Sequence, residues 1–480
     1  TGDLLLPKQA RYRAAPRPEK VEMVFEHRAM TCRAVGVLCR GRTATLATSV
    51  LLALPSPAVV QESLQEDSAA AAAPTPARSS LPGETLTVHL LTIGPGDRVE
   101  ELFGHNALLI RDSATGYEAA FNYGLFDPGA SGFLWNFFRG RMMYRVAPLA
   151  LEPMLASYRA AERRVWAQEL DLEPAARAEL LNLLETASLP ANSQYRYEYF
   201  LNNCSTKLRD VLDVVFDGQL RAATDIPGSD ERVSWRYDTR RLTATKLHYY
   251  AGIDLLLGPR GDEGTSAWQQ MWVPMKLRDT AGGLYITRSD GSRTRLVSSE
   301  EVWVDSAREN EPAASRSMEL LFLFFGTALA VVLVILGRHT AAGSDGGRVM
   351  LSLAGFLWGG FCLVVGALLV AMHWTDHEFM YWNRNFLVFS PLGLGVAFGL
   401  FRTAREGTTG PWGRRSALGS VGLLILALLL YLIPATRQDN LAMIAFALPI
   451  HLAVCWVMLV IHKMDHTLIY AAAVKPRRLR

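Results

Sequence analysis

The sequence is poor in cysteine and in charge. Five cysteines among 480 residues cannot form the disulfide framework of a small secreted scaffold. Charged residues make up only 20% of the chain and the formal net charge is +3, so a nucleic-acid partner has no electrostatic support. Hydrophobic residues make up 50%, which excludes intrinsic disorder of the whole chain. These values indicate a membrane protein with a substantial water-soluble part.

An export signal is expected near the N-terminus. The segment that follows Met30 is first basic and then apolar, and it ends in small residues with the spacing that a signal peptidase reads. We interpret residues 1–60 as an N-terminal extension with a signal peptide; an uncleaved anchor helix is the alternative, and both export the rest. Residues 61–84 lack periodicity and are expected to form a flexible linker. The signal residues are Arg33, Arg40, Arg42, the apolar run 43–54, Ser56 and Ala58.

Residues 85–310 have the pattern of a folded aqueous domain. Apolar residues at helical spacing predict helices at 151–168 and 174–187, and a third helix that begins near Cys204. The first part alternates in the manner of strands separated by turns. The fold class expected is therefore α+β, with an antiparallel sheet plus helices. The expected strands are 87–93, 107–111 and 117–123.

Five apolar stretches between residues 318 and 461 are each long enough to span a bilayer. Cytoplasmic loops carry an excess of Lys and Arg, and the loop charges therefore fix the direction of the spans. With residues 85–310 outside, the inner loops and tail hold eleven basic residues and the outer loops only Arg384 and Arg437. We expect an all-α membrane domain at 318–461 and a basic cytoplasmic tail at 462–480. The spans are 318–337, 349–372, 381–401, 416–434 and 441–461, and the inner basic residues are Arg338, Arg348, Arg402, Arg405, Arg414, Arg415, Lys463, Lys475, Arg477, Arg478 and Arg480.

This topology leaves Cys204 as the one cysteine of the exported domain. An unpaired thiol is a liability in an oxidising compartment, although a buried and inert residue is the alternative. Asn202 and Asn203 precede it and are good N-cap residues, so the thiol is expected at the positive end of a helix dipole. We therefore expect a lowered thiol pKa and a nucleophile. Its backbone N–H, with Asn203 or Asn202, would hold an oxyanion.

His105 is the expected base for this thiol, since it begins a strand after a glycine-containing loop. The expected register of the following hairpin pairs Asn122 with Asn106 and places it diagonal to His105, where its amide would orient the imidazole. A slip of one residue would turn Asn122 to the other face. Asp127 and His89 are then the alternatives.

Other polar motifs have weaker interpretations. Asn106 is a further candidate for substrate or oxyanion contact, and Arg139 lies among aromatic residues that would dock on a phospholipid surface or belong to a core. The outer loop 373–385 contains two histidines and two carboxylates, and we favour an interfacial aromatic belt over a metal site there. Residues 94–97 are interpreted as a tight turn, because a phosphate loop would need a lysine and a following helix.

Several longer motifs resemble one known family. They are LTIGPGD at 91–97, FGHNA at 103–107, NYGLFD at 122–127, FRGR at 138–141 and YRYEYFLNNCSTKLRD at 195–210. Together they are similar to the Lnb N-terminal periplasmic domain family, and the resemblance extends over about residues 85–280.

The resemblance implies a permuted papain-like fold in which the histidine precedes the cysteine, as His105 precedes Cys204. It implies transfer of a fatty acyl chain from a membrane phospholipid, through a Cys204 thioester, to the N-terminal amine of bacterial lipoproteins. The protein would then be a multi-pass protein of the bacterial inner membrane, with phospholipid and apolipoprotein as partners and without metal, cofactor or nucleic acid. A membrane-tethered cysteine hydrolase (peptidase, amidase or lipid hydrolase) and a non-catalytic binding module stay as alternatives.

Overall fold

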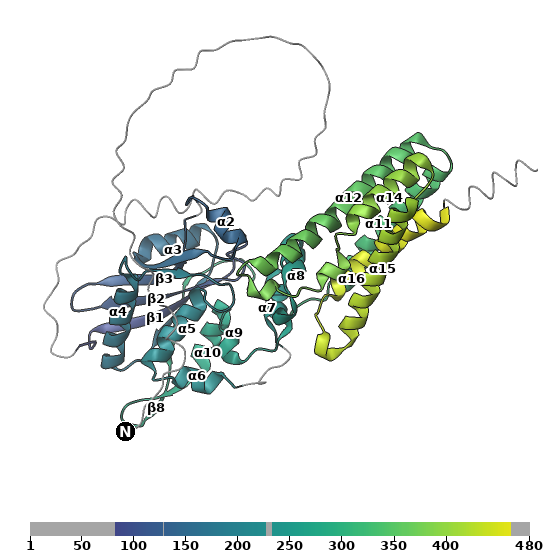
Figure 1. Cartoon of the computed structure of the whole chain (residues 1–480). Helices are drawn as coiled ribbons and strands as arrows, with labels where there is room; N and C mark the ends of the chain where they lie inside the picture. The colour runs from purple at the N-terminus through teal and green to yellow at the C-terminus, as the bar shows by residue number, and fades with distance from the viewer. Residues whose placement is uncertain (1–81, 128, 227–232, 462–480) are drawn as a thin grey trace, which may run out of the picture. The chain divides into compact units, whose positions relative to one another are not determined.

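The computed structural model describes residues 82–127, 129–226 and 233–461. The expected signal peptide, most of the linker at 61–84 and the basic tail at 462–480 lie outside these residues. An antiparallel sheet with helices is followed by a helical region that contains five candidate membrane-spanning helices (Figure 1). The expected fold class is thereby confirmed.

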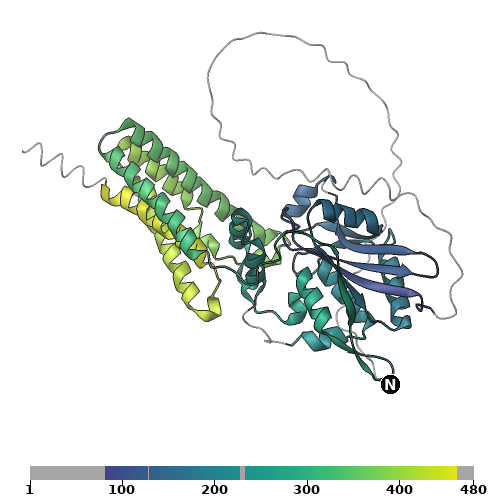
Figure 2. The same ribbon diagram turned by 180° about the vertical axis from the view of Figure 1, so that it is seen from behind.

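A seven-stranded antiparallel sheet is the framework of the aqueous domain (Figure 2). Its strand order is β6-β4-β3-β2-β1-β5-β9, and β7 and β8 form a separate hairpin. The turn between β2 and β3 is closed by a hydrogen bond from the Gly116 N–H to the Asp112 carbonyl, and the φ of +73° at Gly116 favours glycine. The strands are β1 Leu86–Ile93, β2 His105–Asp112, β3 Glu118–Leu125, β4 Met143–Leu149, β5 Val165–Leu170, β6 Gln194–Arg196, β7 Tyr285–Thr287, β8 Arg293–Arg295 and β9 Val297–Val304.

Helices cover both faces of this sheet (Figure 1). On one face, Met154 of α3 packs with Leu109 of β2 and Ala120 of β3. On the other face, Leu208 of α5 packs with Phe121 of β3 in a cluster that α4 and α10 complete. Because alternate side chains of a strand point to opposite faces, the central strands are apolar on both. The helices are α2 Phe133–Phe138, α3 Leu151–Ala160, α4 Pro174–Ser188, α5 Cys204–Val215, α6 Gln219–Thr224, α7 Trp235–Thr243, α8 Leu247–Leu256, α9 Ala267–Gln270 and α10 Pro274–Gly283.

The predicted helix at 151–168 is wrong over its second half. Helix α3 ends at Ala160, Glu162 has a φ of +51°, and strand β5 then begins at Val165. Strand β5 pairs with β1 on one side and β9 on the other, so its backbone hydrogen bonds are satisfied in the sheet. Sheet pairing over a long sequence separation therefore outweighs the helical spacing of these apolar residues. The helix predicted at 174–187 and the one beginning at Cys204 are confirmed.

Five helical segments of the C-terminal region are long and apolar enough to cross a membrane. The third is interrupted between α13 and α14, where Pro391 cannot donate a helical hydrogen bond. Helices α12 and α14 approach closely: a Cβ added to Gly359 would lie 2.3 Å from the Gly393 carbonyl oxygen. Small residues at such crossings allow membrane helices to pack tightly. The helices are α11 Glu319–Ala341, α12 Asp345–Ala371, α13 Asn385–Val388, α14 Gly393–Glu406, α15 Gly410–Leu432 and α16 Leu441–Trp456.

The two loops expected outside the membrane contact the aqueous domain. Asn383 donates to the carbonyls of Leu255 and Leu256 at the end of α8, both at 2.9 Å. Arg240 of α7 donates to Asp439 at 2.7 Å, in the loop before α16. These contacts agree with the direction of the spans that the loop charges predict.

Candidate active site

Cys204 is the first residue of α5, and a capping box fixes this helix end. The Asn203 side chain accepts from the Thr206 N–H at 2.9 Å, and the Thr206 hydroxyl accepts from the Asn203 N–H at 2.8 Å. The Asn203 amide donates to the carbonyls of Tyr199 and Trp272, both at 2.9 Å. Both of its N–H groups are thus engaged, so Asn203 shapes the loop before Cys204 and has no free donor for an oxyanion.

The other two asparagines proposed as oxyanion donors also have structural partners. Asn202 donates to the Arg196 carbonyl at 2.5 Å. Asn106 donates to the Thr92 hydroxyl at 2.8 Å and to the Leu91 carbonyl at 3.4 Å. These amides hold the loop before α5 and the start of β2 in place.

The Cys204 side chain is buried, with 8% of its surface exposed. Burial raises the pKa of the thiol, although the backbone N–H groups of Asn106, Ser205 and Cys204 itself favour the thiolate. The predicted lowering of the pKa is therefore wrong, because desolvation outweighs the helix terminus. In the resting protein Cys204 is a thiol.

His105 begins β2, and its Nε2 lies 3.1 Å from the Asn122 Oδ1. The Asn122 Nδ2 donates to the Ala120 carbonyl at 3.0 Å, which fixes the orientation of the amide. Because the Oδ1 can only accept, the Nε2 carries the proton and the Nδ1 is left as a basic nitrogen. Burial lowers the pKa of His105 to about 4, and the ring is neutral at neutral pH.

The register of the hairpin differs by one residue from the prediction. Asn122 pairs with Ala107 and not with Asn106. Ala107 and His105 lie on the same face of β2, two residues apart, so Asn122 shares the face of the imidazole. The predicted contact between Asn122 and His105 is present in the structure. It forms because Asn122 pairs with Ala107, and not with Asn106 as predicted.

The alternative orienting residues lie elsewhere. Asp127 accepts from the Gly129 N–H at 2.8 Å and closes a local turn. His89 is in the middle of β1, where its ring packs 5.2 Å from that of Trp303. Between the described residues His105 and Cys204 no hydrogen bond is formed. The two residues are nevertheless close in the fold. The backbone N–H of Asn106, which follows His105, is near enough to the Cys204 sulfur to lower the pKa of the thiol.

A buried arginine beside this site was missed by the sequence analysis. Arg163 donates from its Nε to the Gly94 carbonyl at 2.9 Å, and its Nη1 lies 3.6 Å from Glu101. Its Nη2 is buried and has no hydrogen-bond partner among the described residues. The charge of Arg163 lowers the pKa of both Cys204 and His105. Arg163 therefore favours a negative charge at this end of the sheet.

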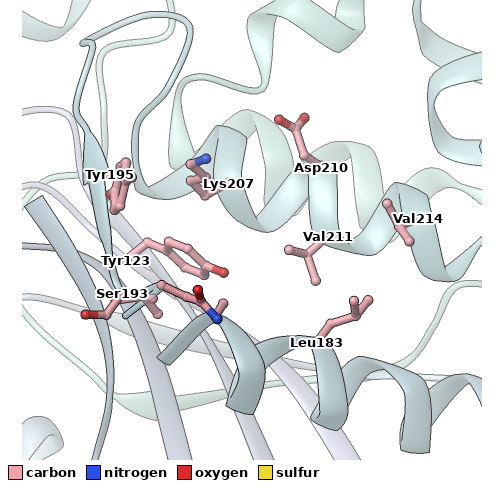
Figure 3. Close-up of a pocket in the computed structure, with 11 residues that line it drawn as sticks. Tyr123, Leu183, Ser193, Tyr195, Lys207, Asp210, Val211 and Val214 are labelled. Carbon is pink, nitrogen blue, oxygen red and sulfur yellow. The ribbon is translucent and has the colours of Figure 1, made fainter. Parts of the chain in front are cut away.

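A cavity of about 280 Å³ opens between α4, α5 and the sheet (Figure 3), and Cys204 is not among its lining residues. A Cβ added to Gly124 would lie 3.6 Å from the Cys204 Cβ and 4.0 Å from the Tyr195 hydroxyl, so Gly124 lies between Cys204 and Tyr195 of the cavity wall. Gly124 has a φ of +101°, a conformation that a side chain would strain. The cavity is lined by Tyr123, Val146, Leu183, Ala187, Asn192, Ser193, Tyr195, Lys207, Asp210, Val211 and Val214.

Helix α2 presents an apolar surface to its surroundings. Leu134 is 70% and Trp135 60% exposed, and none of the residues of α2 is buried. Arg139 follows this helix, and its carbonyl accepts from the Asp376 N–H at 2.8 Å in the outer loop. This segment is therefore not part of a core, and docking on a phospholipid surface stays as the prediction for it.

The polar side chains of the outer loop 373–385 are engaged with the protein. His377 bonds the Phe137 carbonyl at 2.9 Å, Asp376 pairs with Arg141 at 2.8 Å, and Glu378 pairs with Arg260. Across the ranges that the structure describes, no three His, Cys, Asp or Glu side chains are grouped to hold a metal ion. The loop therefore ties the aqueous domain to the membrane helices.

The fold and the site define a membrane protein whose α+β domain carries a cysteine and a histidine–asparagine pair. Residues 73–245 match the family described as the Lnb N-terminal periplasmic domain, which confirms the resemblance over this stretch. The chain is thus a multi-pass membrane protein with a periplasmic domain that is similar to this family over residues 73–245, a range that contains Cys204, His105 and Asn122. Neither a curated protein nor a solved structure matches the chain.

Proposed function

We propose that the protein is a cysteine acyltransferase that moves a fatty acyl chain from a phospholipid to the N-terminal amine of lipoproteins. The observation that carries this proposal is the His105–Asn122 pair, which leaves the His105 Nδ1 unprotonated at the start of β2, close in the fold to Cys204. A nucleophile at a helix start with an oriented imidazole is the arrangement of cysteine acyl-transfer enzymes. The family match and the membrane helices support the lipid and lipoprotein substrates.

In the first half-reaction the Cys204 sulfur attacks the ester carbonyl carbon, and the His105 Nδ1 takes the thiol proton. The tetrahedral oxyanion is held by the Cys204 N–H, which has no partner within its own helix, and by the free Nη2 of Arg163. The imidazolium then protonates the leaving alkoxide. A lysophospholipid departs, and the acyl chain stays on Cys204 as a thioester.

In the second half-reaction the lipoprotein amine attacks the thioester carbonyl, and His105 removes the amine proton. The C–S bond breaks and the sulfur regains a proton from His105. The membrane helices hold the thiol near donor and acceptor and raise their effective concentration. Under this proposal the protein lies in the bacterial inner membrane, with its C-terminus in the cytoplasm.

The central experiment looks for the thioester. Purified full-length protein supplied with phospholipid should gain the mass of one acyl chain on the peptide that contains Cys204, and neutral hydroxylamine should remove it. Cys204→Ser and His105→Ala should both prevent the adduct. Full lipoprotein N-acylation by Cys204→Ala would show that the nucleophile is another residue.

The burial of Cys204 also favours one alternative, a non-catalytic binding module with an inert thiol. Thiol labelling of intact cells separates the two proposals. A binding module predicts no labelling with or without lipid substrate, whereas the acyltransferase predicts that a phospholipid analogue with an electrophile in place of its ester carbonyl labels Cys204.

A further inference from the structure

The two basic residues of the outer loops line one cavity. Arg384 and Arg437 come from different loops, and they meet Arg260 of the short helix η2 (Pro259–Asp262) around a space of about 590 Å³. Basic residues are disfavoured in outer loops, and here both of those present line the same cavity. The remaining lining residues are Pro259, Asp262, Glu263, Glu378, Tyr381, Trp382 and Ala435.

Two of these arginines have no carboxylate partner in the part of the chain that the structure describes. The Arg384 Nη1 is buried without a hydrogen bond. Arg437 donates to the Tyr431 hydroxyl at 3.0 Å and lies over its ring. The acidic side chains nearby are engaged: Asp262 pairs with Arg236 at 2.6 Å, and Glu378 pairs with Arg260. The cavity therefore offers two guanidinium groups to an anion.

The surroundings place this cavity at the level of lipid headgroups. Trp382, which lines the cavity, is 77% exposed. Leu432 is the last residue of the membrane helix α15, lies five residues before Arg437, and is 67% exposed. Exposed tryptophan marks the membrane–water interface, and exposed leucine marks the apolar zone next to it. The cavity is therefore a polar site at the outer end of the membrane-spanning helices.

We propose that this cavity binds the headgroup of a glycerophospholipid from the outer leaflet, with its phosphate on Arg384 and Arg437. Guanidinium groups bind phosphate oxygens through charge-assisted hydrogen bonds. Glu263 lines the same space, forms no ion pair among the described residues, and suits the ammonium group of a zwitterionic headgroup. The site binds lipid whether or not Cys204 transfers acyl chains.

The connection to the thiol is short. Glu378 and Phe379 are neighbours in the 3-10 helix η4 (Glu378–Met380). Glu378 lines the cavity, while the Phe379 ring packs 4.5 Å from that of Phe200, four residues before Cys204. A headgroup in the cavity therefore contacts the element that packs on the active-site loop.

The test measures lipid binding to the full-length Cys204→Ala protein, so that it does not depend on the proposed chemistry. Native mass spectrometry would follow titration with phosphatidylethanolamine and with diacylglycerol of the same chains. Replacing both arginines by Gln should weaken phosphatidylethanolamine binding by about 100-fold, at about tenfold for each lost contact. Arg414→Gln, an exposed arginine of the inner side, is the matched control and should bind as the parent does.

Three results would overturn the proposal. The first is equal binding of phosphatidylethanolamine by the double variant and the parent. The second is binding of diacylglycerol as tightly as of phosphatidylethanolamine, since the headgroup would then contribute nothing. The third is displacement of the lipid by an equal concentration of inorganic phosphate, which would mark a site for a free anion. If Arg384→Gln does not fold, the exposed Arg437→Gln alone should still lose about tenfold.

Discussion

The contact between Asn122 and His105 gives the sharpest prediction about the active site. Asn122→Ala removes the acceptor of the His105 Nε2–H, which lies 3.1 Å away, and leaves that donor without its hydrogen-bond partner. Loss of a partner for a buried donor costs about 1–3 kcal/mol. At 1.36 kcal/mol for each tenfold in rate, kcat/KM for acyl transfer should fall about 5- to 150-fold. The loss stays below the ~10⁴-fold measured for a triad carboxylate, because an amide is neutral.

The assay follows transfer from phosphatidylethanolamine to a diacylglyceryl-cysteine peptide by purified protein in liposomes. Asn122→Asp keeps the acceptor and adds a charge that favours imidazolium, so it should raise the pKa of His105 and shift the acid limb of the pH profile upward. Asn310→Ala changes an exposed asparagine that accepts from Arg164 and should be neutral. An Asn122→Ala protein of normal abundance with activity within about twofold of the parent would refute the role of Asn122 in positioning His105.

Three further predictions concern pH, stability and topology. Burial lowers the pKa of His105 to about 4, so the unprotonated base persists in mild acid: kcat/KM should stay level down to about pH 5 and fall near pH 4, and a limb near pH 6.5 would contradict this. Asp254 is 1% exposed and pairs with Arg236 and Arg240. Asp254→Ala should therefore lower the free energy of unfolding by about 3–5 kcal/mol in a denaturant titration. Asp439 is more exposed and pairs with Arg240, so Asp439→Ala should lower the free energy of unfolding by about 1 kcal/mol or less. A phosphatase fused after residue 480 should be inactive and one fused at residue 310 active; an active C-terminal fusion would contradict the predicted orientation.

The sequence predicts those parts of the site that depend on local structure. Asn202 and Asn203, as good N-cap residues, predict the start of α5 near Cys204, and in the structure Asn203 forms a capping box there with Thr206. The turn after β2 likewise brings Asn122 back to His105. The predicted register of β2 and β3 differs from the observed one by one residue. The turn residues do not fix how the two strands align, because the alignment of β3 also depends on its pairing with β4.

Arg163 and the pKa of the thiol could not be predicted in this way. Arg163 lies between α3 and β5, inside a stretch whose apolar spacing resembles a helix, and only the pairing of β5 with β1 brings it beside His105. The helix terminus was expected to lower the pKa of Cys204. Burial acts in the opposite direction and is stronger, and burial depends on what the sheet and α5 enclose.

The resting protonation states bear on the choice between transfer and hydrolysis. Cys204 is a buried thiol and His105 a neutral imidazole, so the ion pair that attacks an ester has to form when substrate binds. When the sulfur attacks a bound ester, the negative charge that develops on the carbonyl oxygen would be stabilised by Arg163 and the helix terminus. Under the proposed function, the burial that keeps the thiol protonated at rest would also limit the access of water to a thioester on Cys204. An amine delivered from the membrane would then be the better acceptor, and this favours acyl transfer over hydrolysis for the same three residues.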